Sequence, residues 1–161
     1  MDIKSGSGYP SSALSNFAPH PFEIDGIQCS SMEGFLQSLK FENPDMQKYV
    51  CTLVGLQAKY KGKDKKWWKT QTLWWQGKEI DRHSQEYQDL LDRAYDALSK
   101  NTGFQRALLA TKDSSITHSI GKSDASHTVL TQREFCGRLE KIRKILQNKL
   151  AFHEVIFETI L

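Results

Sequence analysis

The sequence has little that would indicate an extracellular, membrane or metal-containing protein. Its three cysteines, Cys29, Cys51 and Cys136, are odd in number, and none belongs to a CxxC or Cys/His ligand pattern. We expect buried free thiols with neither a metal site nor a cofactor; a reactive thiol at Cys29 is the alternative. No apolar run approaches the roughly 20 residues that span a bilayer, and residues 1–10 lack the apolar core of a signal peptide. We therefore expect a cytoplasmic protein with no membrane partner.

Repeats, long linkers and low-complexity segments are also missing. The chain has 161 residues, of which 39% are hydrophobic and 25% charged, as is ordinary for a globular protein. This predicts one domain over 1–161. Gly121-Lys122-Ser123 looks like the end of a phosphate loop, but Ile116 stands where the earlier glycine is required, which excludes a P-loop nucleotide triphosphatase.

Positive charge is concentrated in one segment. The net charge is +3, and residues 59–69 hold six lysines and only one acidic residue, Asp64. Such a block favours contact with phosphates. A lysine-rich surface that only interacts with solvent is the alternative.

A short amphipathic helix is predicted over residues 31–41. Its apolar stripe consists of Met32, Phe35, Leu36 and Leu39. Glu33, Gln37 and Lys40 lie on a neighbouring face. Ser30-x-x-Glu33 has the spacing of a capping box, in which Glu33 would bond the Ser30 amide. A catalytic carboxylate at the helix start is the other interpretation, and this segment alone does not decide between them.

The other elements follow from turns, caps and apolar periods. Residues 1–21 are predicted to be loop, in which Leu14 and Phe17 anchor Ser15 and Asn16 in a pocket wall. A strand or hairpin is expected over 22–27. The expected helices cover residues 46–53, 56–60, 84–101, 104–111 and 131–146, with caps at Ser84 and Thr131; residues 113–130 form a polar loop, and 152–161 pack as a last helix or strand. These elements predict an α+β fold that is mainly helical with a minor β component.

All four tryptophans fall within residues 67–80, as Trp67-Trp68 and Trp74-Trp75. Tryptophans flanked by lysines can stack on bases while the lysines neutralise phosphates. They can equally fill a core edge. We expect at least two of the four in the core, and whether one lines a ligand pocket stays open.

Several segments together resemble the NADAR (YbiA-like) family. The motifs that carry the resemblance are Leu14-Ser15-Asn16-Phe17, Ser31-Met32-Glu33-Gly34-Phe35-Leu36-Gln37-Ser38-Leu39-Lys40-Phe41, Ala58-Lys59 with Gly62-Lys63, and residues 104–111 followed by His118. The resemblance covers about residues 13–146 and implies a YbiA-like fold. In the family a tryptophan precedes a long helix, but residues 80–83 stand there in this chain. One of the four tryptophans is therefore expected to supply that ring.

The resemblance implies an N-glycosidase that hydrolyses a ribosyl–nitrogen bond. The implied reactions are removal of ADP-ribose from modified guanine and cleavage of a ribosylaminopyrimidine phosphate of riboflavin synthesis. The expected partners are thus an ADP-ribosyl or ribose-phosphate substrate, with ADP-ribosylated nucleic acid as one form of the first. The predicted catalytic residues are Glu33 and Asp124, and the predicted substrate-binding residues are Ser15, Asn16, Phe17, Lys40, Lys59, Gly62, Trp67, Trp68, His118, Gly121 and Lys122.

Three readings of the function remain open at this point. In the enzyme, Glu33 would stabilise positive charge on the anomeric carbon or activate water, and the helix N-terminus would favour its ionised form. A non-catalytic module that binds ADP-ribose or NAD would not need Glu33. A protein that binds nucleic acid through its lysines and tryptophans would show a steep salt dependence.

Overall fold

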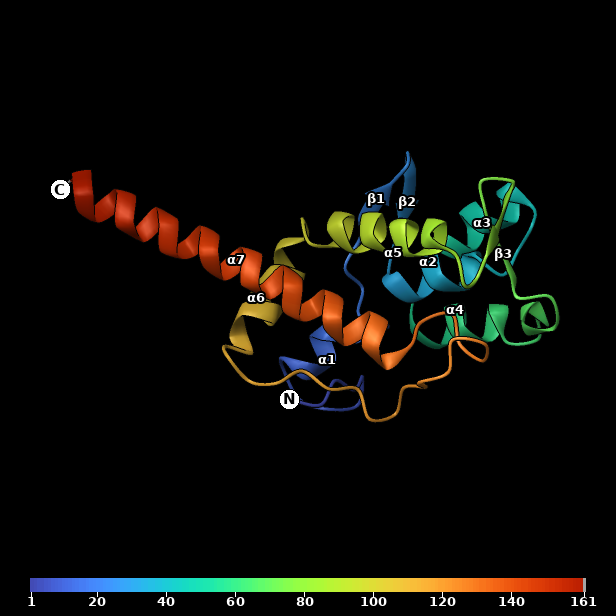
Figure 1. Cartoon of the computed structure of the whole chain (residues 1–161), viewed down its shortest axis with the longest axis horizontal. Coiled ribbons are helices and arrows are strands. Elements are labelled where there is room, and N and C mark those ends of the chain that lie inside the picture. Colours follow the sequence, from blue (N-terminus) through green and yellow to red (C-terminus); the bar gives the residue numbers. More distant parts are fainter. Residues whose placement is uncertain (161) are drawn as a thin grey trace.

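Helices dominate the computed structural model, which describes residues 1–160 (Figure 1). The helices are α1 (Ser11–Leu14), α2 (Met32–Ser38), α3 (Pro44–Cys51), α4 (Gly55–Gly62), α5 (Gln85–Leu98), α6 (Thr102–Ala110) and α7 (Gln132–Ile160), with a 3-10 turn, η1, at Trp67–Lys69. The strands are β1 (Phe22–Ile24), β2 (Ile27–Cys29), β3 (Thr72–Trp75) and β4 (Lys78–Asp81). The predicted α+β class, mainly helical with a minor β component, is confirmed.

The strands form two separate antiparallel hairpins, β1–β2 and β3–β4. Each turn has two residues with positive φ: Asp25 (50°) and Gly26 (79°) in the first, Gln76 (51°) and Gly77 (83°) in the second. Two positive φ angles are the requirement of the tight turn that matches strand twist. The Asp-Gly pair made the first hairpin predictable. The second was hidden, because two adjacent tryptophans obscure the alternation of a strand.

Helix α2 packs against α3, α4 and strand β2 (Figure 1). Its apolar stripe is buried, as predicted. Gly34 permits the close approach of α3, because a Cβ there would lie 2.5 Å from the Leu53 carbonyl oxygen and 2.9 Å from that of Val50. This packing fixes the start of α2 against the end of α3 and the residues that follow it. It therefore also fixes the position of Glu33, which lies in the first turn of α2.

Most of the expected helices are present, with two differences at the chain ends. Residues 11–14 form a helical turn inside the predicted loop. The tail does not pack as an element of its own; α7 continues to Ile160 with its last turns exposed. Residue 161, the end of that predicted tail, lies outside the described residues. Cys29 and Cys51 are buried free thiols, as expected, and Cys136 is half-buried.

Within residues 1–160 no helix has both the length and the apolar character needed to cross a membrane.

Candidate active site

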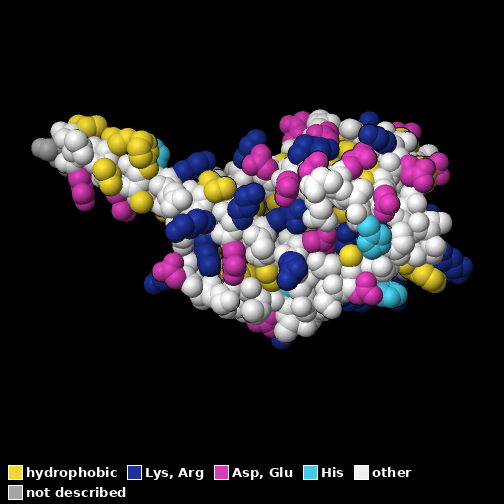
Figure 2. Space-filling model, viewed as in Figure 1, with side chains coloured by type: hydrophobic (Ala, Val, Ile, Leu, Met, Phe, Trp, Pro, Cys, Tyr) yellow, Lys and Arg dark blue, Asp and Glu magenta, His cyan; other side chains and the backbone are white. Residues whose placement is uncertain are grey.

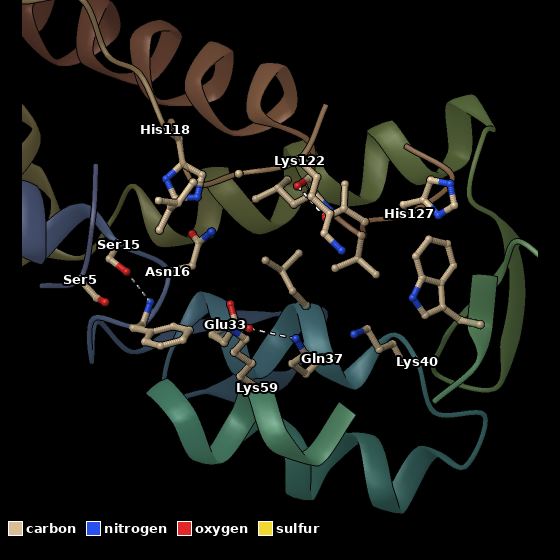
Figure 3. A pocket seen from close by; sticks show the side chains of 18 residues that line it. Ser5, Ser15, Asn16, Glu33, Gln37, Lys40, Lys59, His118, Lys122 and His127 are labelled. Carbon is tan, nitrogen blue, oxygen red and sulfur yellow. Dashed lines mark hydrogen bonds between the residues drawn. The ribbon is translucent and has the colours of Figure 1, made fainter. Parts of the chain in front are cut away.

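The carboxylate of Glu33 is not used to cap its own helix. The cap is Ser31, whose hydroxyl accepts a hydrogen bond from the Gly34 amide (3.0 Å) and donates to the Leu53 carbonyl (2.9 Å). The predicted capping box of Ser30 and Glu33 is therefore wrong by one residue. The Ser30 amide, which the capping box would have joined to Glu33, instead donates a hydrogen bond to the Cys51 carbonyl oxygen. Glu33 stands in the first turn of α2 with its carboxylate directed into a cavity (Figure 3).

The cavity has a volume of about 340 Å³ and lies between α2, α4 and the polar loop before α7 (Figure 3). That volume falls in the range of small-molecule sites, about 300–1,000 Å³. Its lining residues are Ser5, Ser15, Asn16, Phe17, Glu33, Leu36, Gln37, Lys40, Lys59, Trp67, His118, Ile120, Gly121, Lys122, His127, Thr128, Val129 and Leu130. Ten of the thirteen predicted site residues are among them, so segments far apart in the sequence do converge here.

Burial sets the protonation behaviour of Glu33. Loss of solvent raises the pKa of its carboxyl above the ordinary value of 4.5, and this exceeds the opposing effects of Gln37, Lys40 and Lys59. The sequence-based expectation, a helix N-terminus that favours the ionised form, is thus wrong in direction. Lys40 shows the matching effect, because burial lowers the pKa of its ammonium group although Glu33 opposes this. The site thus holds a partly desolvated carboxyl, Glu33, beside one partly desolvated cation, Lys40, whereas Lys59 and Lys122 are exposed.

Gln37 holds the Glu33 carboxylate in place. Its amide nitrogen donates to Glu33 Oε1 (2.9 Å), one helical turn away. Its amide oxygen is buried and has no hydrogen-bond partner within the described residues. Gly62 of α4 lies directly behind that oxygen, since a Cβ at position 62 would come within 2.0 Å of it. Gly62, predicted to bind substrate, therefore lies outside the cavity lining and provides room for Gln37.

The N-terminal loop supplies one wall, as the sequence predicted. The Glu33 amide donates to the Asn16 carbonyl (3.0 Å), which ties this loop to the start of α2. The Asn16 side-chain oxygen accepts from the Tyr95 hydroxyl (2.9 Å), so its NH₂ group is the part left to donate to a ligand. Ser15 accepts from the Phe17 amide (3.2 Å), which leaves its hydroxyl proton for the same use.

The polar loop before α7 supplies the opposite wall. His118 Nδ1 bonds the Ile3 carbonyl (2.7 Å) and must donate there, which leaves Nε2 for the cavity. Gly121 has no room for a side chain, because a Cβ would lie 2.5 Å from the His118 ring. Lys122 follows at the cavity wall and adds a third cation to Lys40 and Lys59 (Figure 3).

A buried ion pair, which the sequence did not reveal, braces this wall. Arg82 forms two hydrogen bonds to Glu134 (2.7 and 3.1 Å), and its Nε donates to the Thr128 carbonyl (2.9 Å). Glu134 also accepts from the Thr131 amide (2.8 Å), which confirms the capping box predicted for α7. The hydrogen bond to Thr128 links Arg82, the residue that follows strand β4, to the cavity lining.

One tryptophan of the four lines the cavity. Trp67 is only 8% exposed and is among the lining residues. Trp75 is buried against Phe35, with ring centroids 5.1 Å apart. The expectation of at least two buried tryptophans is confirmed. Trp68 is 49% exposed and lies outside the lining, and Trp74 is half-buried.

Asp124 is the third predicted site residue that the fold does not bring to the cavity. Its side chain is 62% exposed and pairs with His127 at 3.6 Å. Among the described residues that line the cavity, Glu33 alone carries a carboxylate. No cluster of three or more His, Cys, Asp or Glu side chains suited to a metal occurs in the part of the chain described.

Some lining residues were not predicted. Gln37 had a usable signal, because it follows Glu33 by four residues on the same helix face. Ser5, His127 and residues 128–130 had none, since they reach the cavity only through long-range packing. Ile120 stands between the predicted residues His118 and Gly121.

Comparison with known proteins agrees with the motifs. Residues 8–144 match the family described as Bacteriophage protein GP30.3. The chain is 38% identical over 151 residues to the "Uncharacterized 17.1 kDa protein in Gp30-rIII intergenic region" of Enterobacteria phage T4, covering 91% of this chain and 98% of that protein. The NMR structure of the E. coli protein YbiA is similar with a TM-score of 0.54 and 18% identity, over 96% of this chain and 86% of that chain. The chain thus belongs to the bacteriophage GP30.3 protein family and has the YbiA-like fold that its resemblance to the NADAR family implied.

Proposed function

We propose that this protein is an N-glycosidase that hydrolyses a ribosyl–nitrogen bond, with Glu33 as its catalytic carboxylate. The observation that carries the proposal is the environment of Glu33: the capping role falls to Ser31, and the carboxylate is held by Gln37 in a cavity with three lysines. The proposed substrates are ADP-ribose linked to guanine, in which case the partner is modified nucleic acid, and a ribosylaminopyrimidine phosphate.

The reaction separates charge across the scissile bond between the sugar and the nitrogen. The bond from the anomeric carbon to nitrogen breaks with its electron pair going to the nitrogen, and positive charge develops on the sugar. A carboxylate beside the sugar stabilises that charge. Water then bonds to the anomeric carbon, and Glu33 takes the proton that the water loses. The departing nitrogen takes up a proton from solvent, which gives the free sugar and the free base. A carboxyl with a raised pKa is a stronger base than an ordinary one once it is ionised.

The remaining lining groups suit the rest of such a substrate. Lys40, Lys59 and Lys122 are donors for phosphate oxygens. The Asn16 amide and the Ser15 hydroxyl are donors for ribose oxygens, and the Trp67 ring offers a face for stacking on a base.

The test is a mass-resolved hydrolysis assay. Three substrates are offered: ADP-ribosylated guanine in DNA, NAD, and a ribosylaminopyrimidine phosphate. We expect one of them to be cleaved by the wild type and by Glu42→Gln, an exposed carboxylate that follows α2. Glu33→Gln should lower that rate by about 10²–10⁴-fold without loss of binding. Full activity in a folded Glu33→Gln protein would refute the assignment.

The alternative function is a non-catalytic module that binds ADP-ribose or NAD. The observation in its favour is that Asp124, the expected second carboxylate, lies outside the cavity. Absence of hydrolysis of all three substrates, with ADP-ribose still bound, would favour this module.

A further inference from the structure

The second half of α7 is the largest feature of the molecule that the proposed active site does not use. Beyond Leu146, which still packs on the core, the helix projects from the body of the protein (Figure 1). This segment lies beyond residues 8–144, the part that matches the family. Hydrophobic side chains gather on it (Figure 2). Those at least 40% exposed on α7 are Ile145, Leu150, Phe152, Val155, Ile156, Phe157 and Ile160.

An isolated helix with so many exposed apolar side chains is not a stable arrangement in water. A helix in a globular protein keeps its stability chiefly by burying its apolar face. Large exposed apolar patches mark sites of association. The projecting helix therefore needs a surface to cover it.

The charges along the helix indicate which surface that is. Lys141, Lys144 and Lys149 lie in the half nearest the body, and Glu154 and Glu158 lie in the half nearest the tip. A parallel pair of such helices would bring like charges level with each other. An antiparallel pair whose midpoint lies between residues 151 and 152 brings Lys144 within one residue of the level of the partner's Glu158. These two side chains are 14 residues apart in the chain and so lie on the same side of the helix. The helix is thus complementary in charge to a reversed copy of itself.

A groove at the base of α7 is positioned to receive the tip of that copy. It lies between α5 and α7, has a volume of about 400 Å³, and includes Ile142, Ile145 and Lys141 in its lining. In the antiparallel arrangement, the partner's Ile160 comes within one residue of the level of Ile142. The apolar part of the groove would then face the apolar tip, and Lys141 and Lys144 would lie near the partner's Glu158.

We propose that the projecting half of α7 pairs antiparallel with the same segment of a second copy of this chain, and that each tip seats in the α5–α7 groove of the other. Paired residues 143–160 give a contact about 27 Å long at 1.5 Å per residue. The dimer leaves both active-site cavities open, because the cavity lining includes no residue of α7. The proposal does not depend on the function proposed above.

Analytical ultracentrifugation of the full chain tests the pairing. We expect the wild type to reach twice its chain mass of 18.5 kDa as its concentration rises. Phe157→Asp should remain monomeric. Leu56→Asp on α4 is the matched control and should dimerise like the wild type, because Leu56 is 54% exposed and Phe157 is 66% exposed. Circular dichroism confirms that each variant is folded.

A charge-exchange experiment then identifies the partner and its direction. Glu154→Lys/Glu158→Lys and Lys144→Glu/Lys149→Glu should each dimerise roughly tenfold more weakly than the wild type, and an equal mixture of the two should regain the dimer. The proposal is overturned if the wild type stays monomeric. If that monomer sediments with phosphatidylcholine vesicles, a lipid surface covers the helix instead of a second copy, and the proposal is equally overturned. It is also overturned if either charge variant dimerises normally alone or if the mixture stays monomeric.

Discussion

A single methyl group at position 62 tests how the proposed active site is built. Gly62→Ala would place a Cβ 2.0 Å from the Gln37 amide oxygen, 3.0 Å from its Cδ and 3.2 Å from Lys40 Cδ. Because Gly62 belongs to helix α4, the backbone cannot yield easily, and the Gln37 side chain must move. It then loses its hydrogen bond to Glu33, although the substituted residue itself does not line the cavity.

The expected magnitudes follow from that one contact. A hydrogen bond to a charged group contributes about 1.5–3 kcal/mol. Alanine in a helix regains about 0.5–1 kcal/mol relative to glycine. The net loss of stability is then about 1–2 kcal/mol, and each kcal/mol lowers Tm by about 2–4 °C in a chain of this size. If the same bond orients Glu33 in the transition state, kcat falls by roughly 10- to 100-fold.

Thermal melting and steady-state hydrolysis measure both effects. The matched control is Gly137→Ala on α7, where a Cβ meets nothing within 4 Å, so both Tm and kcat should stay at or above wild-type values. The pH profile is a third readout. The Gln37 bond lowers the pKa of Glu33, and its loss should move the acid limb of activity to higher pH. Unchanged kcat and an unchanged acid limb in Gly62→Ala would refute the positioning role of Gln37.

Further predictions concern charge, stacking and the buried ion pair. Activity should fall as the pH drops through the raised pKa of Glu33, above 4.5, and Lys40→Met should move that fall to higher pH, because Lys40 lowers the pKa. Glu33→Gln should raise Tm at neutral pH, since burial disfavours the ionised carboxyl, and the gain should vanish below pH 4.5, where the carboxyl is protonated in both states; an equal gain at all pH values would contradict this. In thermal melts, Trp67→Ala should cost about 3–5 kcal/mol as a large buried residue, whereas Trp68→Ala should cost less than about 1 kcal/mol. Denaturant unfolding of Arg82→Met should show a loss of about 3–5 kcal/mol, because a buried carboxylate is left without its partner.

Local sequence patterns predicted the elements that depend on neighbouring residues. The apolar period of α2, the Asp25-Gly26 turn and the cap of α5 at Ser84 all involve contacts within a few residues, and all are present. The family motifs added which polar segments belong to one site, and Ser15 and Glu33 do line one cavity.

What the sequence alone determined was therefore helices α2 to α6 and the start of α7, the turn chemistry of the first hairpin and the polar face that holds Glu33. Only the tertiary structure decided which serine caps α2, because Ser31 is selected by the Leu53 carbonyl, 22 residues along the chain. It likewise decided that Trp67 rather than Trp68 lines the cavity, and that Asp124 lies outside it. Burial also reversed the expected direction of the Glu33 pKa, because loss of solvent is a property of the whole fold and no local spacing records it.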